Sequence, residues 1–124
     1  MSEGVTEVRG LIYTVDYEFR PGRVRIEGDR IAEVAFCTEG ELSEAERDTL
    51  VLPGLVDVHF HGAAGYDFCD GTKEAFHAIE TYENRHGITS ICPATMTLPV
   101  EELEQILRNA AAYKRAQDEH RAAN

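Results

Sequence analysis

The apolar run VLPGLVDVHF, residues 51–60, constrains the fold more than any other part of this sequence. A strand that is apolar on both sides needs cover on both of its faces, as in a parallel sheet packed between helices. Apolar residues then recur at helical spacing in 72–86, with Thr72 predicted as the N-cap and Gly87 as the C′ residue. A second short apolar strand follows in 88–95, and a second helical stripe begins near Pro99, with Thr97 or Leu98 as the capping residue. The order strand, helix, strand, helix predicts a βαβα unit of a parallel sheet.

The first fifty residues predict a different kind of structure. Residues 5–15 are rich in strand-forming residues, and Pro21-Gly22 predicts a turn. Residues 23–36 alternate apolar and charged side chains around Gly28-Asp29, which predicts a hairpin, and residues 40–49 predict a surface connection or a short helix. We therefore expect a small antiparallel layer in residues 1–52 and the parallel unit in residues 53–124.

Composition excludes several classes of partner. The net charge of -11 argues against nucleic acids and anionic membranes, since phosphate binding needs a basic surface. No segment approaches the ~20 apolar residues of a membrane span, and the first residues lack the features of a secretory signal. The three cysteines are odd in number and far apart, which favours reduced thiols in the cytoplasm.

Alternation along the apolar strand places Asp57, His59 and His61 on one face. Residues two apart lie ~6.6–6.8 Å apart along a strand, so two imidazoles can lean towards one metal ion. The pair also lies at the carboxyl end of its strand, where parallel barrels place their sites. The alternative is that both are hydrogen-bonded histidines on a half-exposed strand. Glycines in the next loop, Gly62 and Gly65 among them, let the backbone bend beside a ligand.

Three stretches carry a resemblance to a known family. LPGLVDVHFHG resembles the first-strand motif P-G-x-x-D-x-H-x-H of the amidohydrolase superfamily. HGAAGYDFCDGT and HGITSICPATMTLPVEEL are similar to the beginning of the N-acetylglucosamine-6-phosphate deacetylase family. The resemblance implies an α/β protein: the N-terminal part of a small β-sandwich in residues 1–52, then the first two βα units of an incomplete (β/α)₈ TIM barrel in residues 53–124.

The resemblance also implies an activity. The family hydrolyses the acetamide of N-acetylglucosamine 6-phosphate with metal-activated water in amino-sugar catabolism, giving glucosamine 6-phosphate and acetate. His59 and His61 match ligands of a divalent metal, zinc or iron. Asp57 matches a residue that supports the strand or orients the histidines, and Gly62 and Gly65 match loop positions with a backbone role. A cytoplasmic homodimer is the expected form of the complete enzyme.

The resemblance leaves part of the site unaccounted for. The family's glutamate ligand lies in an H-x-E-G-P-type motif that does not occur here, and its further histidines and catalytic aspartate come from later strands. We therefore expect no catalytic residue in this chain, and we expect the chain to be the beginning of a longer protein and inactive by itself. The remaining candidates are assigned structural roles; they are His77, His86, His120, Asp67, Asp70 and Cys69.

Three alternatives stay open on sequence alone. One is another amidohydrolase of the dihydroorotase or cyclic-amidase type, which a carboxylated lysine in place of the glutamate ligand would favour. A second is a non-catalytic truncated module that binds metal or pairs with a subunit. A third is a small α+β domain in which strands from residues 1–50 join the same sheet as the histidine strand.

Overall fold

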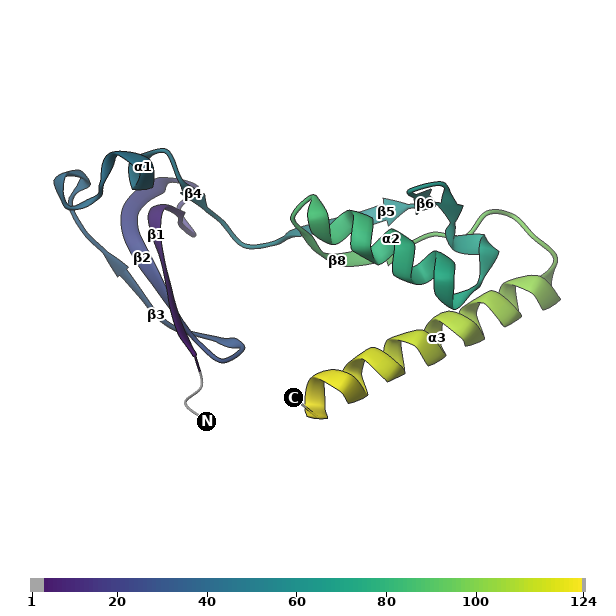
Figure 1. Ribbon diagram of the computed structural model, residues 1–124. Helices are drawn as coiled ribbons and strands as arrows, with labels where there is room; N and C mark the ends of the chain where they lie inside the picture. The colour runs from purple at the N-terminus through teal and green to yellow at the C-terminus, as the bar shows by residue number, and fades with distance from the viewer. Residues whose placement is uncertain (1–3, 124) are drawn as a thin grey trace. The chain divides into compact units, whose positions relative to one another are not determined.

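The computed structural model describes residues 4–123 and the side chains of residues 4–119. The chain divides into two compact units, Met1–Pro53 and Gly54–Asn124, and their separate architectures can be followed in Figure 1. The division lies one residue beyond the boundary expected from the sequence. Within the described range, no helix combines the length and apolar character that a membrane crossing requires.

The first unit is a four-stranded sheet with the order β3-β2-β1-β4. β1 (Val5–Tyr13), β2 (Phe19–Glu27) and β3 (Arg30–Phe36) are antiparallel neighbours, and β4 (Leu50–Val51) adds a short parallel pairing to β1. The turn between β2 and β3 lies at Gly28-Asp29, as predicted, with Gly28 at a φ of 59°. η1 (Glu39–Glu41) and α1 (Glu44–Arg47) form the predicted short helical connection.

The turn predicted at Pro21-Gly22 is wrong. Both residues lie inside β2, opposite Leu11 and Gly10 of β1, and the chain reverses instead between Thr14 and Glu18. Gly22 is buried, and a side chain there would come within 2.8 Å of the Ile12 side chain. Glycine is therefore needed here because another strand of the sheet comes close, and a local sequence pattern cannot reveal such a contact.

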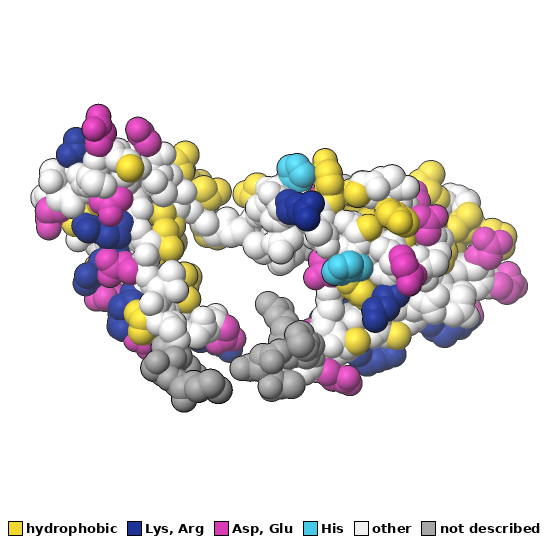
Figure 2. All heavy atoms as spheres, in the orientation of Figure 1, with side chains coloured by type: hydrophobic (Ala, Val, Ile, Leu, Met, Phe, Trp, Pro, Cys, Tyr) yellow, Lys and Arg dark blue, Asp and Glu magenta, His cyan; other side chains and the backbone are white. Residues whose placement is uncertain are grey.

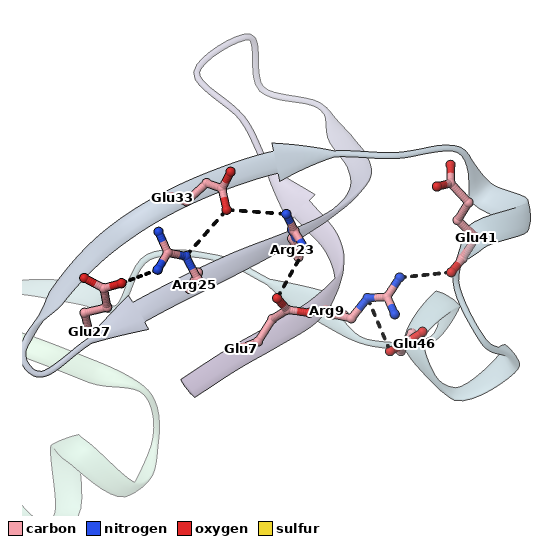
Figure 3. Close-up of polar contacts among 8 residues, drawn as sticks. All are labelled: Glu7, Arg9, Arg23, Arg25, Glu27, Glu33, Glu41 and Glu46. Carbon is pink, nitrogen blue, oxygen red and sulfur yellow. Dashed lines mark hydrogen bonds and ion pairs between the residues drawn. The ribbon is translucent and has the colours of Figure 1, made fainter. Parts of the chain in front are cut away.

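One face of this sheet carries a ladder of ion pairs (Figure 3). Arg23 lies between Glu7 and Glu33, each 3.5 Å away, and Arg25 contacts Glu33 and Glu27. The opposite face buries Ile12 and Val24. Exposed ion pairs contribute at most ~1 kcal/mol each. The main effect of the ladder is therefore to make this face of the sheet polar, and its contribution to stability is small.

The second unit contains a separate parallel pair, β5 (Leu55–Phe60) and β8 (Ile88–Pro93). α2 (Lys73–Arg85) connects them through the loop hairpin β6 (Gly62–Ala63) and β7 (Tyr66–Asp67) and the turn η2 (Phe68–Asp70), and α3 (Val100–Ala123) follows β8. Since β5 pairs only with β8 among the described residues, the alternative of one sheet shared with residues 1–50 is wrong.

Local signals at α2 are confirmed. The Thr72 hydroxyl accepts a hydrogen bond from Ala75 N at 3.2 Å, and Gly87, after the last turn, has a φ of 81°. Phe76 of α2 packs with Phe68 of η2 and Ile106 of α3 to form the core of this unit. α3 begins at Val100, directly after Pro99, so neither Thr97 nor Leu98 stands immediately before the helix.

The expected cover on both faces of the histidine strand is not found. Val56 and Val58 are 58% and 73% exposed, and Leu55 is also open to solvent. Apolar side chains accordingly appear at the surface of this unit in Figure 2. The physical reason is that α2 packs on β8, the β6–β7 hairpin, η2 and α3 more than on β5, which leaves much of a two-stranded sheet uncovered.

Candidate metal centre at the end of β5

Two histidines lie together where β5 ends. His59 is the fifth residue of β5 and His61 directly follows the strand. Their ring centroids are 5.1 Å apart and the ring planes are nearly perpendicular, at 87°. His59 is exposed and His61 is half-buried. The sequence predicted this pairing from the two-residue period of a strand.

The ring of His61 is oriented by the backbone beyond the neighbouring strand. Its Nδ1 lies 3.0 Å from the carbonyl oxygen of Ala94, which directly follows β8. A carbonyl oxygen can only accept, so Nδ1 carries the hydrogen and Nε2 is the ring nitrogen that can present a lone pair. Ala94 is itself fixed, because its N–H donates to Phe60 O at 2.8 Å. Outer contacts of this kind hold metal-binding histidines in the required tautomer.

Asp57 contacts the strand backbone. Its Oδ1 accepts a hydrogen bond from the N–H of His59 at 3.0 Å. The carboxylate therefore supports the backbone at His59, and its role towards a metal centre stays a prediction.

Two glycines of the following loop, Gly62 and Gly65, are each required by a different feature of the backbone geometry. A side chain at Gly62 would overlap the carbonyl oxygen of Tyr66 and lie 2.8 Å from Asp67 Cα, across the β6–β7 pairing. Gly65 has a φ of 83° at the tip of this hairpin, next to Ala64 at 54°. Such φ values are adopted readily by glycine, so the hairpin folds back sharply beside the histidines.

Sequence reasoning missed a contact between the loops after β5 and β8. The N–H of Met96 donates to Cys69 Sγ at 3.1 Å, and the N–H of Cys69 donates to Asp67 Oδ1 at 2.7 Å. Asp67 and Asp70 form the capping box of η2, in agreement with the structural roles predicted for them from the sequence. Burial raises the pKa of the Cys69 thiol, the two aspartates raise it further, and the Met96 N–H opposes them.

The pair can be tested against the geometry of a metal ion. With Zn–N bonds of ~2.0–2.1 Å, a ring centre lies ~3.2 Å from the ion, and two rings at a tetrahedral angle lie ~5 Å apart. The observed centroid separation of 5.1 Å fits that arrangement. Among the described residues the His59 ring makes no hydrogen bond, and no group of three or more His, Cys, Asp or Glu could hold a metal ion. The described part thus places two candidate ligands side by side.

The other histidines lie elsewhere. His77 is on α2, 3.5 Å from the hydroxyl of Tyr113, and His86 is at the carboxyl end of α2, where its Nδ1 lies 2.8 Å from Tyr82 O. The side chain of His120 lies outside the described residues. The structure brings neither His77 nor His86 into a group with the β5 pair.

Comparisons with known proteins agree on one enzyme class. Over 90 residues, 66% of this chain, the sequence is 30% identical to the N-acetylglucosamine-6-phosphate deacetylase of Bos taurus. Over 71 residues, 56% of this chain, it is 32% identical to an N-acetylgalactosamine-6-phosphate deacetylase of Escherichia coli O157:H7. The chain spans only 22% and 19% of these two proteins. No family model matches it.

A solved structure shares the fold. It is a mutant N-acetyl-D-glucosamine-6-phosphate deacetylase from Mycobacterium smegmatis in complex with N-acetyl-D-glucosamine-6-phosphate. The TM-score is 0.73 at 24% identity, with 91% of this chain and 30% of that chain covered. The α/β class predicted from the sequence is confirmed, while closure into a sandwich and a barrel stays a prediction. The resemblance itself is confirmed: this chain is similar to a part of N-acetylglucosamine-6-phosphate deacetylase.

Proposed function

We propose that this chain supplies two ligands, His59 and His61, to a divalent metal centre in an enzyme that deacetylates N-acetylated amino-sugar phosphates. The observation that carries the proposal is the contact between His61 Nδ1 and Ala94 O, which turns Nε2 of the ring into the available ligand atom. The ring separation of 5.1 Å and the similarity to named deacetylases support it.

Each residue of the site has a separate task in this proposal. When bound, zinc or iron supplies Lewis-acid activation of water and of the amide carbonyl. Ala94 O holds the His61 ring in one orientation, while Asp57 fixes the backbone at His59. The general base and the remaining ligands come from polypeptide outside these 124 residues, since the curated relatives are several times longer.

The substrate is proposed as a class. The relatives are named for two sugars, the 6-phosphates of N-acetylglucosamine and N-acetylgalactosamine, which share the acetamide and the phosphate. Hydrolysis gives acetate and the free amino-sugar phosphate, as in amino-sugar catabolism, with N-acetylglucosamine 6-phosphate as the first choice. We further propose a cytoplasmic homodimer as the working enzyme, and the three unpaired cysteines are compatible with a reducing compartment.

Metal titration of the 124-residue chain tests this proposal. We expect weak Co²⁺ or Zn²⁺ binding that falls at least about tenfold in the double variant His59→Ala/His61→Ala. The matched control is His86→Ala, because that ring is exposed and already contacts Tyr82 at the end of α2. Calorimetry together with the visible absorption of Co²⁺ gives the affinity. Unchanged binding in the double variant would reject the two ligands.

A further inference from the structure

The segments that leave β5 and β8 are joined at the carboxyl ends of these strands. Ala94 N donates to Phe60 O at 2.8 Å, and His61 Nδ1 donates back to Ala94 O at 3.0 Å. Two residues farther on, Met96 N donates to Cys69 Sγ at 3.1 Å. The segment 94–99 has neither helix nor strand of its own, so these contacts are what fix its first residues.

The Cys69 thiol lies on the hydrogen-bonded turn η2. Cys69 N donates to Asp67 Oδ1 at 2.7 Å, and Asp67 N donates to Asp70 Oδ2 at 2.9 Å. The preceding residue, Phe68, is buried in the core of this unit, and its N–H donates to His61 O at 2.7 Å. The turn is therefore anchored both to the core and to the backbone of the proposed ligand.

Cys69 has the properties of a neutral acceptor more than those of a metal ligand. The thiol is half-buried and packs against the cluster of Phe68, Phe76 and Ile106. Burial and the neighbouring aspartates raise its pKa, whereas a cysteine that binds zinc does so as a thiolate. Its sulfur already has a partner in the Met96 N–H.

We propose that Cys69 is a positioning residue for the metal centre: by accepting the Met96 N–H, its sulfur holds segment 94–96 where the Ala94 carbonyl fixes the ring of His61. This inference rests on the proposed role of His61 as a ligand. It assigns a task to the glycine-rich loop, which links the ligand strand β5 to the backbone beyond β8.

The alternative is that Cys69 only fills space, and three variants of the whole chain separate the two roles. Cys69→Ala keeps most of the packing but removes the acceptor. Cys69→Ser restores an acceptor, as a hydroxyl oxygen. Cys92→Ala is the matched control, because Cys92 is an exposed thiol on β8 outside these contacts.

The experiment measures three quantities in each variant: the His61 tautomer from ¹⁵N chemical shifts, the exchange rate of the Met96 amide, and the Co²⁺ affinity. In Cys69→Ala we expect faster Met96 exchange, a mixed His61 tautomer and a Co²⁺ affinity about tenfold lower. Cys69→Ser returns all three towards the values of the unsubstituted chain, and Cys92→Ala leaves them unchanged.

The outcomes separate this inference from the proposed function. An unchanged His61 tautomer and Met96 exchange rate in Cys69→Ala overturn the positioning role, even where the histidine double variant loses Co²⁺. A shifted tautomer supports the contact by which Cys69 positions the His61 ring. If the histidine double variant then binds Co²⁺ normally, the ligand assignment is rejected, and the role of Cys69 for the metal centre is rejected with it. Should Cys69→Ala fail to fold, Cys69→Ser decides: a retained tautomer supports the proposal and a lost one overturns it.

Discussion

Tyr113 of α3 forms a polar contact with α2 in the second unit. Its hydroxyl donates to Glu80 Oε2 at 2.5 Å, while its ring packs on Phe76 with centroids 5.6 Å apart. Burial raises the pKa of Tyr113 to about 12, and the adjacent Glu80 carboxylate raises it in the same direction. The neutral hydroxyl is thus the form that the helix pair favours.

The direction of the pH dependence follows from this shift. The folded pKa lies above the ordinary value of ~10, so the contact contributes its full stability below pH ~10 and loses it as the pH rises towards 12. We expect one tyrosine to ionise later than the others in an ultraviolet titration. Tyr113→Phe removes that late step, whereas the control Tyr17→Phe, at an 83% exposed turn residue, retains it. A late step that persists in Tyr113→Phe would contradict the assignment.

Single residues also show how much of the site was predictable. The proximity of His59 and His61 was predictable because a strand has a period of two, while their role as ligands stays a prediction. The partner of His61 could not be found, because a backbone carbonyl such as that of Ala94 carries no sequence signal. Cys69 was interpreted as a packing or surface thiol, since its contact with Met96 joins residues 27 positions apart.

At the scale of elements, the β6–β7 hairpin links the proposed ligands to the core. It begins one residue after His61 and ends at Asp67, the residue that caps η2. The hydrogen bond from Phe68 N to His61 O closes its base. Because Gly62 lies against Tyr66 and Asp67, the hairpin depends on the absence of a side chain there.

Substitution of Gly62 should destabilise the hairpin, whereas substitution of Gly65 should not. Gly62→Ala places Cβ against the paired strand and should destabilise the hairpin by about 1–3 kcal/mol. The matched control is Gly65→Asn, because nothing lies within 4 Å of a side chain there and asparagine tolerates a positive φ. Amide exchange at Phe68 measures the closure. Equal protection in both variants would show that the close approach at Gly62 does not matter.

Turns and helix ends that depend on neighbouring residues in the sequence were predicted well. The cap at Thr72, the stop at Gly87 and the turn at Gly28-Asp29 each depend on neighbours in sequence, and all three are present. The turn expected at Pro21-Gly22 failed because the burial of Gly22 against Ile12 and β3 depends on strands distant in sequence.

At the scale of the whole molecule, the second unit buries little of its apolar strand. Its core joins η2, α2 and α3, while Val56 and Val58 of β5 stay largely exposed. The sequence predicted cover for both faces of this strand because apolar runs usually have it. The apolar sequence of β5 indicates that both of its faces need packing partners, and the described residues supply only part of them.

The expected activity follows from which acidic residues lie near the histidine pair. Acid–base catalysis by a positioned side chain contributes ~10²–10⁴-fold, yet the carboxylate nearest the histidines in sequence, Asp57, is engaged with the backbone of His59. Within the described range no further acidic residue joins the histidine pair in a metal-binding group. We therefore expect the 124-residue chain with Zn²⁺ and N-acetylglucosamine 6-phosphate to release no acetate above the background of free Zn²⁺.

A coupled acetate assay on the purified chain measures this directly, with His59→Ala/His61→Ala and His86→Ala run in parallel. Acetate release that the double variant abolishes and His86→Ala retains would contradict the prediction, since it would mean that these residues suffice for a working centre. Release that is equal in all three samples would come from free metal or a contaminating enzyme. Metal binding without turnover is the result that the two proposed ligands, held by β5 and Ala94 with no general base beside them, should give.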